Sequence, residues 1–448
     1  MTHLPFEVAI RDLGVHGEGI GRADSGMTVF VPGALPGEDV LVHPDIVKAH
    51  YTRARLQSIK TSSPKRVTPF CEYFGTCGGC QLQHLDYTAQ LQWKCDHIQS
   101  AFSRIAGLTP RIQPVLASPD SVGYRNKAQF PVRPNDSGAC QLGFYAPQSH
   151  TLVPVGHCAI QHPLIDSVYQ RIQEGLLKFN IRPYDETTHF GDLRHVLLRY
   201  SHTQNAVWVV FVLNMSKATI LNDLVAWLVS LPGIGGVLAN FNRDKRNAVL
   251  GRETTLLYGD GVFTEQLDHV KFQFSPVSFS QVNWPQTAHL YRTVSDLAAL
   301  TPDQTIWDLY CGAGTIGVYL ANQVTSVLGV ESVDSAIVQA QHNAQLNGVS
   351  HAKFVSHNLD HGIPESVCIG RPDVVIVDPP RKGCSDMVVT DLIRVAAPKI
   401  VYVSCDPATM ARDAKILCQS GYTLETLVPL DMFPHTTHVE CVGLFTLS

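Results

Sequence analysis

Apolar segments and helical segments alternate regularly from Thr305 onwards. Short apolar runs predict strands at 305–310, 326–330, 374–377 and 400–403, and apolar residues at helical spacing predict helices at 315–322 and 333–347. Strands that alternate with helices are typical of an α/β fold with a doubly wound parallel sheet. Ligands bind such sheets at the carboxyl ends of the strands, so the residues that follow each strand are the candidates for function.

The first 60 residues have a different pattern. Short β-prone segments at 6–13, 28–31, 38–42 and 52–59 are separated by glycine and proline turns, which predicts a small β-barrel. A helix is predicted over 86–105, with a stop at Gly107. Between Tyr124 and about Phe274, mixed strands and helices are predicted, with strands at 128–132, 195–201, 206–213 and 236–241 and a helix at 218–231.

Composition narrows the class of protein. The 448 residues suggest two to four domains, at about 100–200 residues per domain. No apolar run approaches the roughly 18 residues that span a bilayer, and the first residues do not resemble a signal peptide, so we expect a cytoplasmic protein without a membrane partner. A net charge of −5 excludes a globally basic nucleic-acid-binding protein but leaves a local basic face open. Residues 47–66 carry six Lys or Arg and no acid, which fits either a solvated barrel edge or a phosphate-contacting face.

Glycines and an acid follow the first two strands of the alternating region. Residues 308–317 (DLYCGAGTIG) form a glycine-rich turn after the first strand, and Glu331 follows the second. Glycines allow a sharp turn and a close approach to a ligand, and an acid at this distance typically accepts hydrogen bonds from ribose hydroxyls. The pattern favours a nucleoside-containing cofactor over an ordinary tight turn.

Three further motifs come later in the chain. Residues 378–381 (DPPR) follow a strand. The two prolines stiffen the segment after the strand, so that its acid and its arginine can face a cleft. In residues 404–407 (SCDP), Asp406 and Pro407 have the pattern of a helix start, which would place the Cys405 thiol at a helix N-terminus that favours thiolate. Glu440 precedes a final apolar strand, where desolvation would raise its pKa and suit a general base.

Together these residues resemble the RNA uracil-5-methyltransferase family, and most closely its iron–sulfur branch, which makes 5-methyluridine in 23S ribosomal RNA. The resemblance spans essentially the whole chain and rests on 378–381, 404–407 and 438–440 in that order. It implies three domains: a TRAM-like β-barrel at 1–62 that binds RNA, a mixed α/β central domain at 63–277 and a Rossmann-like S-adenosylmethionine-dependent methyltransferase domain at 278–448. It also suggests that the helix at 86–107 packs on the catalytic domain.

The resemblance also assigns roles to residues. Cys405 would be the nucleophile that adds to C6 of uracil, which makes C5 reactive toward a methyl group, and Glu440 would be the base that removes the C5 proton. S-adenosylmethionine would contact a set of six residues: Gln281, Tyr310, Thr315, Glu331, Asn358 and Asp378. Because the target base must leave its stack, RNA contacts are expected at Arg125, Lys127, Phe279 and Arg381.

Four of the twelve cysteines form a set that needs its own explanation. Cys71, Cys77 and Cys80 lie close together in the chain, and Cys158 is distant. Thiolates favour iron–sulfur clusters or zinc, and the spacing alone does not separate the two. The family resemblance implies a [4Fe-4S] cluster on these four, with a structural or RNA-docking role.

Two alternatives stay open. The first is methylation of transfer RNA at uridine 54 by the same chemistry. The second is a redox-sensing, RNA-binding protein whose sheet has lost catalysis. We expect a monomer, and the sequence does not name the target nucleotide.

Overall fold

The computed structural model describes residues 4–246, 248–364 and 370–448, which form two compact units. The first unit contains the described residues up to His97, together with Tyr145–Val153 and Phe433–His438. The second contains Ile98–Phe144, Pro154–Met432 and Val439–Ser448. The barrel lies in the first unit and the large parallel sheet in the second, so the two parts of the predicted fold are both present.

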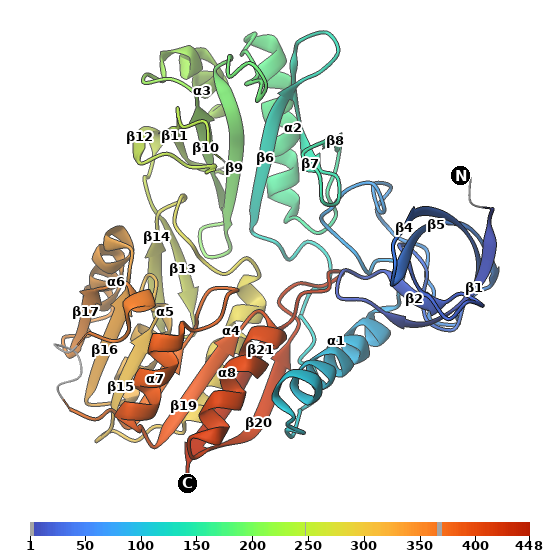
Figure 1. Cartoon of the computed structure of the whole chain (residues 1–448). Helices are drawn as coiled ribbons and strands as arrows, with labels where there is room; N and C mark the ends of the chain where they lie inside the picture. Colours follow the sequence, from blue (N-terminus) through green and yellow to red (C-terminus); the bar gives the residue numbers. More distant parts are fainter. Residues whose placement is uncertain (1–3, 247, 365–369) are drawn as a thin grey trace. The chain divides into compact units, whose positions relative to one another are not determined.

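Five strands of the first unit close into a barrel, in the order β1-β2-β3-β5-β4 (Figure 1). Their bounds are β1 (Phe6–Leu13), β2 (Gly19–Arg22), β3 (Thr28–Val31), β4 (Asp39–Val47) and β5 (Tyr51–Thr61). Alternate side chains such as Val8, Ile10, Val29 and Val31 fill the barrel because successive residues of a strand point to opposite faces. The strands expected from the alternation are therefore confirmed.

A buried ion pair stabilises the end of the barrel. The Glu38 carboxylate is fully buried and accepts hydrogen bonds from the Arg66 guanidinium, with Nη2 at 2.8 Å from Oε2, and from the backbone N–H of Leu35. Arg66 is one of the six cations of the basic segment 47–66. Its guanidinium is already paired with Glu38 and is therefore less available to an external phosphate. In the same segment, Lys60 pairs with Glu7 on the surface and Arg55 remains mostly exposed.

The segment Phe433–His438 belongs to the first unit, although its chain neighbours lie in the second. Its His435 carbonyl accepts hydrogen bonds from the backbone N–H groups of Gln81 and Leu82, at 3.0 and 2.9 Å. The buried Gln90 side chain accepts from His435 N–H at 3.0 Å and donates to the Leu82 carbonyl at 3.0 Å. The segment before Glu440 is thus tied to the residues that follow Cys80.

The central part of the second unit is a mixed sheet covered by helices. Its strands lie in the order β12-β11-β10-β9-β6-β7, and β10 and β11 are parallel. The bounds are β6 (Lys127–Pro134), β7 (Cys140–Tyr145), β9 (Leu193–Ser201), β10 (Ala206–Leu213), β11 (Ile234–Phe241) and β12 (Glu253–Gly259), with β8 (Leu152–Pro154) as a short strand after β7. The helical elements are α2 (Pro163–Lys178), η2 (Thr219–Leu221) and α3 (Asn222–Leu228), and a hairpin of β13 (Phe263–Leu267) and β14 (Val270–Phe274) follows.

The last part of the second unit is the predicted doubly wound sheet, in the order β17-β16-β15-β18-β19-β21-β20 (Figure 1). Strands β15 to β19 are parallel, and β21 runs antiparallel between β19 and β20. The strands are β15 (Thr305–Leu309), β16 (Ser326–Glu331), β17 (Ala352–Ser356), β18 (Val374–Val377), β19 (Lys399–Ser404), β20 (Tyr422–Leu430) and β21 (Glu440–Leu447).

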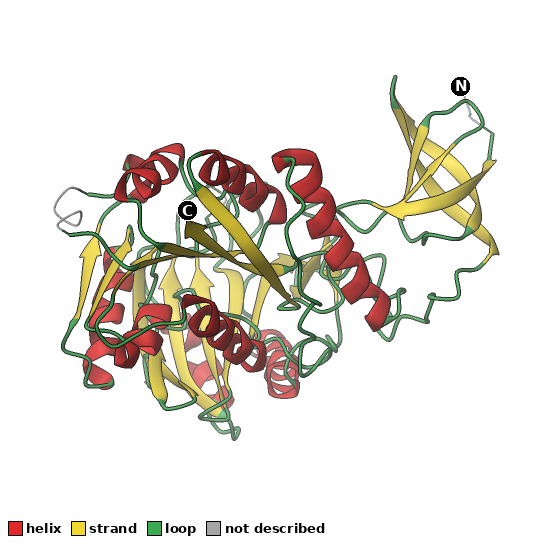
Figure 2. Ribbon diagram, turned by 90° about the horizontal axis from the view of Figure 1, so that it is seen from below, coloured by secondary structure: helices red, strands yellow, loops and turns green. Residues whose placement is uncertain are grey.

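Helices cover both faces of this sheet (Figure 2). One apolar core joins the sheet to α4, α5 and α6, through residues such as Leu290, Ile316 and Ile337. The other core joins it to α7 and α8, through Val388 and Met410. The helices are α4 (Trp284–Ala298), α5 (Thr315–Leu320), α6 (Asp334–Leu346), α7 (Asp386–Val395) and α8 (Pro407–Gln419), with 3-10 turns η3 (Ala321–Gln323) and η4 (Leu359–His361).

The helix expected at 86–105 is α1 (Tyr87–Ala101), which continues as a π-helical turn, η1 (Phe102–Ala106). A left-handed Gly107 ends it, as predicted. Ile98, Phe102 and Ala106 belong to the same core as Met410. The end of this helix therefore packs against α8, which covers one face of the parallel sheet. No helix of the described residues is long and apolar enough to cross a membrane.

Candidate active site

The candidate residues gather at one edge of the parallel sheet. Tyr310 follows β15, Glu331 ends β16, Asp378 follows β18 and Cys405 follows β19. Because β21 is antiparallel, its first residue, Glu440, lies at the same edge. This is the edge at which doubly wound sheets bind their ligands.

The strand register places Cys405 opposite Glu440. Ser404 pairs with Cys441, so the next residues in each direction are Cys405 and Glu440. The Glu440 carboxylate acts electrostatically on the Cys405 thiol, which also requires proximity. Cys405 is half-buried and Glu440 is buried. The sequence motifs named both residues, and the antiparallel strand explains how they meet.

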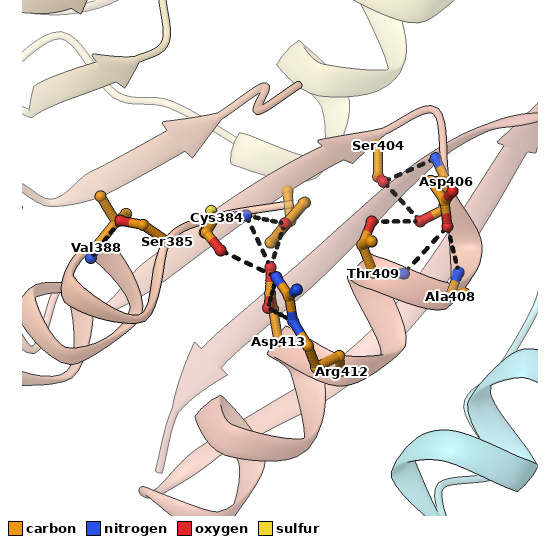
Figure 3. Close-up of polar contacts among 10 residues, drawn as sticks. Cys384, Ser385, Val388, Ser404, Asp406, Ala408, Thr409, Arg412 and Asp413 are labelled. Atoms are coloured by element: carbon orange, nitrogen blue, oxygen red, sulfur yellow. Dashed lines mark hydrogen bonds and ion pairs between the residues drawn. The ribbon is translucent and has the colours of Figure 1, made fainter. Parts of the chain in front are cut away.

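Helix α8 begins directly after Cys405, as the sequence predicted. The Asp406 side chain caps the helix by accepting from Ala408 N at 2.9 Å and Thr409 N at 3.1 Å (Figure 3). The Ser404 hydroxyl accepts a hydrogen bond from Asp406 N at 3.1 Å. This capping holds the backbone around Cys405 in a defined turn.

One sequence-based prediction about Cys405 is wrong for the protein alone. Burial raises the pKa of the Cys405 thiol to about 12, the carboxylates of Glu440 and Asp378 add to the rise, and Arg381 opposes it. The helix N-terminus does not offset these effects, because the Asp406 carboxylate already binds the free backbone N–H groups there. Cys405 is therefore held as a thiol until its surroundings change.

The pKa predicted for Glu440 is borne out. Burial raises the pKa of Glu440 well above its usual range, Asp378 raises it further and Arg381 lowers it. Burial likewise raises the pKa of Asp378. Two buried carboxylates next to one another favour states in which one of them holds a proton, which suits proton transfer.

The loop after Asp378 is fixed by a buried cluster that sequence reasoning missed. Asp413 on α8 accepts at Oδ2 from Cys384 N at 3.0 Å (Figure 3). The same oxygen accepts from Tyr402 Oη at 2.7 Å. Arg412 donates to the Cys384 carbonyl at 2.9 Å. A Cβ on Gly383 would approach Arg412 Nη2 to 2.6 Å, so the loop fits closely against α8. The sequence did contain one indication of this cluster, since Asp413 lies on the helix face that otherwise carries apolar residues.

The glycine-rich turn and Glu331 form one structure. Glu331 accepts from Gly312 N at 3.2 Å with one oxygen and from Val333 N at 2.9 Å with the other. Gly312 has a φ of 53°, and a Cβ there would meet nothing within 4 Å, so the space beside Gly312 is open. Tyr310 is also left-handed, with a φ of 63°. This edge can accept a nucleoside, whose ribose hydroxyls Glu331 could bind.

The remaining predicted cofactor contacts lie on neighbouring elements. Thr315 begins α5, and its hydroxyl accepts from Tyr291 at 2.6 Å. Asn358 follows β17 and accepts from Asp360 N at 2.9 Å. Gln281 lies before α4, and its carbonyl accepts from Asn126 at 3.2 Å. Tyr291 was not anticipated, because a buried tyrosine in a helix resembles ordinary core.

The predicted RNA contacts are accessible to different degrees. Phe279 is 71% exposed, and Arg381 is exposed beside Asp378. Arg125 and Lys127 are half-buried at the start of β6.

The four cysteines are divided between the two units. Cys71, Cys77 and Cys80 lie in the first unit and Cys158 in the second. Gly79 N–H donates to Cys77 Sγ at 3.4 Å, and Cys71 acts electrostatically on Cys77. Among the described residues, no group of three or more His, Cys, Asp or Glu is arranged to hold a metal ion.

Three family models match the chain. A tRNA (uracil-5-)-methyltransferase model matches residues 371–447, a methyltransferase small domain model matches 272–401, and a TRAM domain model matches 6–56. The first match contains Asp378, Cys405 and Glu440.

Relatives align over nearly the whole length. An uncharacterized RNA methyltransferase of Clostridium tetani is 38% identical over 443 residues, covering 98% of this chain and 96% of that protein. One of Listeria innocua is 37% identical, covering 99% and 97%. Among solved structures, the Pyrococcus abyssi tRNA (uracil-54, C5)-methyltransferase in complex with S-adenosyl-L-homocysteine has a TM-score of 0.80 and 29% identity, covering 98% of this chain and 100% of that one.

Proposed function

The chain belongs to the TRAM-containing RNA uracil-5-methyltransferase family, and on that premise we propose that Cys405 and Glu440 methylate C5 of a uridine in RNA. The observation that carries the proposal is the strand register, in which Cys405 and Glu440 are opposed at the ligand-binding edge of the sheet. A thiol and a base in this arrangement suit addition to a pyrimidine and removal of its proton.

The steps assign one task to each residue. Cys405 loses its proton to water and its sulfur bonds to C6 of uracil, while the C5–C6 double bond breaks and its electron pair moves toward O4 to give an enolate with a nucleophilic C5. S-adenosylmethionine would supply the methyl group from its sulfonium; C5 would bond to that carbon, and the electron pair of the broken S–CH3 bond would stay on sulfur, which leaves as S-adenosylhomocysteine. Glu440 then removes the C5 proton, and the electron pair expels the Cys405 thiolate to restore the ring. Asp378 and Arg381 set the charge around both residues.

Six residues are proposed to hold the methyl donor: Gln281, Tyr310, Thr315, Glu331, Asn358 and Asp378. The open space beside Gly312 and the position of Glu331 at the end of β16 support this assignment. Holding C5 and the methyl group in line is the main requirement of the transfer.

We propose 23S ribosomal RNA as the substrate, because of the resemblance to the iron–sulfur branch. Transfer RNA is the second candidate, since the Pyrococcus abyssi enzyme acts on uridine 54 of transfer RNA and aligns over 98% of this chain. The TRAM barrel at 1–62, Arg125, Lys127, Phe279 and Arg381 are the proposed RNA contacts. Methylation of each deproteinised RNA, followed by mass spectrometry of its nucleosides, separates the two substrates.

A [4Fe-4S] cluster on Cys71, Cys77, Cys80 and Cys158 remains part of the proposal. The proximity of Cys71 to Cys77 and the N–H donated to Cys77 Sγ support it, because iron–sulfur ligands commonly accept such bonds. Iron and sulfide analysis of protein purified without oxygen, together with its visible absorbance, tests the cluster, and loss of both in Cys77→Ser identifies a ligand.

The domain limits 1–62, 63–277 and 278–448 and a cytoplasmic location are proposed on the same basis. The TRAM match at 6–56 lies within the first of these domains.

Two substitutions test the reaction. Cys405→Ala should abolish methyl transfer, whereas Cys418→Ala, at a half-buried cysteine near the end of α8, should retain it. Glu440→Gln should accumulate a covalent RNA adduct that migrates slowly in a denaturing gel. Substantial transfer by Cys405→Ala would reject the mechanism. RNA binding by the wild-type protein without methyl transfer would instead favour a non-catalytic, redox-sensing RNA-binding protein.

A further inference from the structure

Two cationic side chains lie directly opposite each other in the central sheet. Lys127 on β6 pairs with Arg199 on β9 in antiparallel register. Directly opposed residues project to the same face, and like charges in this position destabilise a sheet. Arg125 precedes Lys127 by two residues, and its charge acts on both of the others. Three cations therefore cluster in a place where folding alone would disfavour them.

Burial increases this cost. Arg199 is 1% exposed, and burial lowers the pKa of Lys127 to about 7, with Arg199 and Arg125 adding to the shift. Among the described residues, Arg199 Nη1 has no hydrogen-bond partner and none of the three cations makes an ion pair with an acid. Arg199 has two carbonyl acceptors and the Phe263 ring as partners, but buried cations are normally paired with an anion, and the ion pairs of the described residues include none for this cluster.

The acid that acts on Arg199 is already engaged. Glu265 accepts hydrogen bonds from His202 N at 3.0 Å and from Thr203 N at 3.1 Å, and burial raises its pKa to about 7. Burial thus leaves Glu265 and Lys127 each only partly charged near neutral pH, and the two arginines keep the cluster positive. The cluster keeps a net positive charge that an external anion could neutralise.

The same residues hold the loop that presents Phe279. Arg199 donates to the carbonyls of Pro276 and Ser278. On the other side of Phe279, Asn126 donates its side chain to the Gln281 carbonyl at 3.2 Å and its backbone N–H to the Val282 carbonyl at 2.8 Å. An exposed aromatic ring thus sits on a loop that is fixed on both sides, next to a proposed cofactor contact.

We propose that Arg125, Lys127 and Arg199 form a binding site for a phosphate of the RNA backbone beside the uridine that is methylated. This inference rests on the proposed function. Lys127 and Arg125 are half-buried and contact the phosphate, and Arg199 lies behind them, adds its charge and positions the Phe279 loop. Phosphate contacts fix the register of a nucleic acid, and an aromatic ring can stack on a displaced base. The two together place one nucleotide at the sheet edge.

Lys127→Gln is the main test, because it removes one charge and keeps much of the side-chain length. We expect the affinity for a fluorescein-labelled single-stranded oligouridylate to fall about tenfold, as for loss of one charge-assisted hydrogen bond. The slope of log affinity against log salt should become shallower by about 0.7. Thermal stability should stay the same or rise, because the substitution removes a repulsion from Arg199. A purely structural lysine would give lower stability and unchanged RNA binding, which would overturn the proposal.

Lys217→Gln is the matched control, since Lys217 is exposed on the segment after β10. It should keep the wild-type affinity and salt slope. Binding of S-adenosylhomocysteine, measured by calorimetry, should be unchanged in Lys127→Gln. Weaker binding of that ligand with normal RNA binding would assign the cations to the carboxylate of the cofactor and overturn the phosphate site.

The outcomes also separate this inference from the proposed function. Suppose that the wild-type protein transfers methyl groups and that Lys127→Gln binds RNA normally. This result would overturn the proposed phosphate site and support the proposed function. Loss of RNA affinity in Lys127→Gln, with no methyl transfer by the wild-type protein to any RNA, would support the site and reject the function.

Discussion

Tyr402 Oη on β19 lies 2.7 Å from Asp413 Oδ2 on α8 and donates a hydrogen bond to it. The same carboxylate oxygen accepts from Cys384 N at 3.0 Å. Tyr402 precedes Cys405 by three residues, and Cys384 follows Asp378 by six. One buried carboxylate therefore joins the loop that carries Asp378 and Arg381 to the strand and helix that carry Cys405.

Tyr402→Phe should lower both stability and turnover. Removing this hydroxyl leaves the Asp413 carboxylate with one donor fewer, at a cost of about 1–3 kcal/mol for a buried charged acceptor. We expect kcat to fall and S-adenosylhomocysteine affinity to weaken, since Asp413 anchors the loop that carries Asp378, a proposed cofactor contact. Thermal unfolding and single-turnover methylation measure the two effects.

Tyr422→Phe is the control for this substitution. Tyr422 is buried at the start of β20 and donates to the Ala397 carbonyl at 2.9 Å, away from the loop after Asp378. It should lose stability without a comparable loss of kcat. Equal changes in kcat for the two variants would mean that Tyr402 contributes only to stability.

The Cys405 thiol should react slowly with iodoacetamide at neutral pH. Burial, together with Glu440 and Asp378, raises its pKa to about 12, so the thiolate fraction increases with pH throughout the accessible range. We expect the alkylation rate, measured by mass spectrometry of the Cys405 peptide, to keep rising above pH 9. Glu440→Gln should increase the rate at a given pH, because it removes a charge that disfavours thiolate.

Arg381 should lower the pKa of the Cys405 thiol, whereas Glu440 raises it. Its guanidinium lowers the pKa of Cys405 and of Glu440, so Arg381→Gln should decrease the alkylation rate and Arg381→Lys should retain most of it. A rate that levels off near pH 7 in the wild-type protein would contradict the raised pKa.

Glu38 should make barrel stability sensitive to acid. Although burial favours its neutral form, hydrogen bonds from Arg66 and from the Leu35 and Ser63 N–H groups hold the pKa of Glu38 below its usual value of 4.5. A folded-state pKa below the unfolded value gives stability that is present above pH 4.5 and is lost as pH falls through the folded value. Glu38→Gln should reduce stability by about 3–5 kcal/mol at pH 7, because it leaves Arg66 without its partner.

Glu7→Gln provides the comparison. Glu7 pairs with Lys60 on the barrel surface, and such exposed pairs contribute about 0–1 kcal/mol. The free energy of unfolding of the barrel, measured by chemical denaturation at pH 7 and pH 4, should fall much more in Glu38→Gln than in Glu7→Gln at pH 7. A similar small effect for both would show that the Glu38–Arg66 pair contributes little.

Phe279→Ala should reduce kcat/KM for RNA by about tenfold or more, as expected for loss of a base-stacking ring. Phe190→Ala is a matched control, because Phe190 is also highly exposed, at 78% against 71% for Phe279. It should leave kcat/KM unchanged. Equal activity in the two variants would exclude Phe279 from the substrate site.

The local sequence pattern predicted those elements whose apolar residues form a short, uninterrupted run. Strands β3 and β18 begin and end where the alternation placed them, because each is bounded by polar or turn residues. The exposed strand β12 and helix α4 were not predicted. Helix α4 buries Gln286, Thr287 and Thr293, so its inward face does not appear apolar in the sequence.

The roles of Cys405 and Glu440 came from the family resemblance, whereas their proximity depends on a non-local pairing. Helix α8 and strand β20 lie between the two residues in the chain, and no local pattern states that β21 inserts beside β19. The thiol pKa was predicted incorrectly because the burial of Cys405, and after it the charges of Glu440 and Asp378, arise only in the folded sheet. The sequence likewise does not predict that Lys127 and Arg199 lie opposite each other, because this depends on the register of β6 and β9.

The order of strands at this end of the sheet has a consequence for synthesis of the protein. Strand β20 leaves the ribosome before β21, yet β21 separates it from β19 in the folded sheet. A nascent chain that stops after β20 contains Cys405, the proposed nucleophile, but lacks Glu440, the proposed base, and the strand that β20 pairs with. The order of this sheet therefore requires β21 to be synthesised before β20 can take its place beside it, so this end of the sheet is completed last.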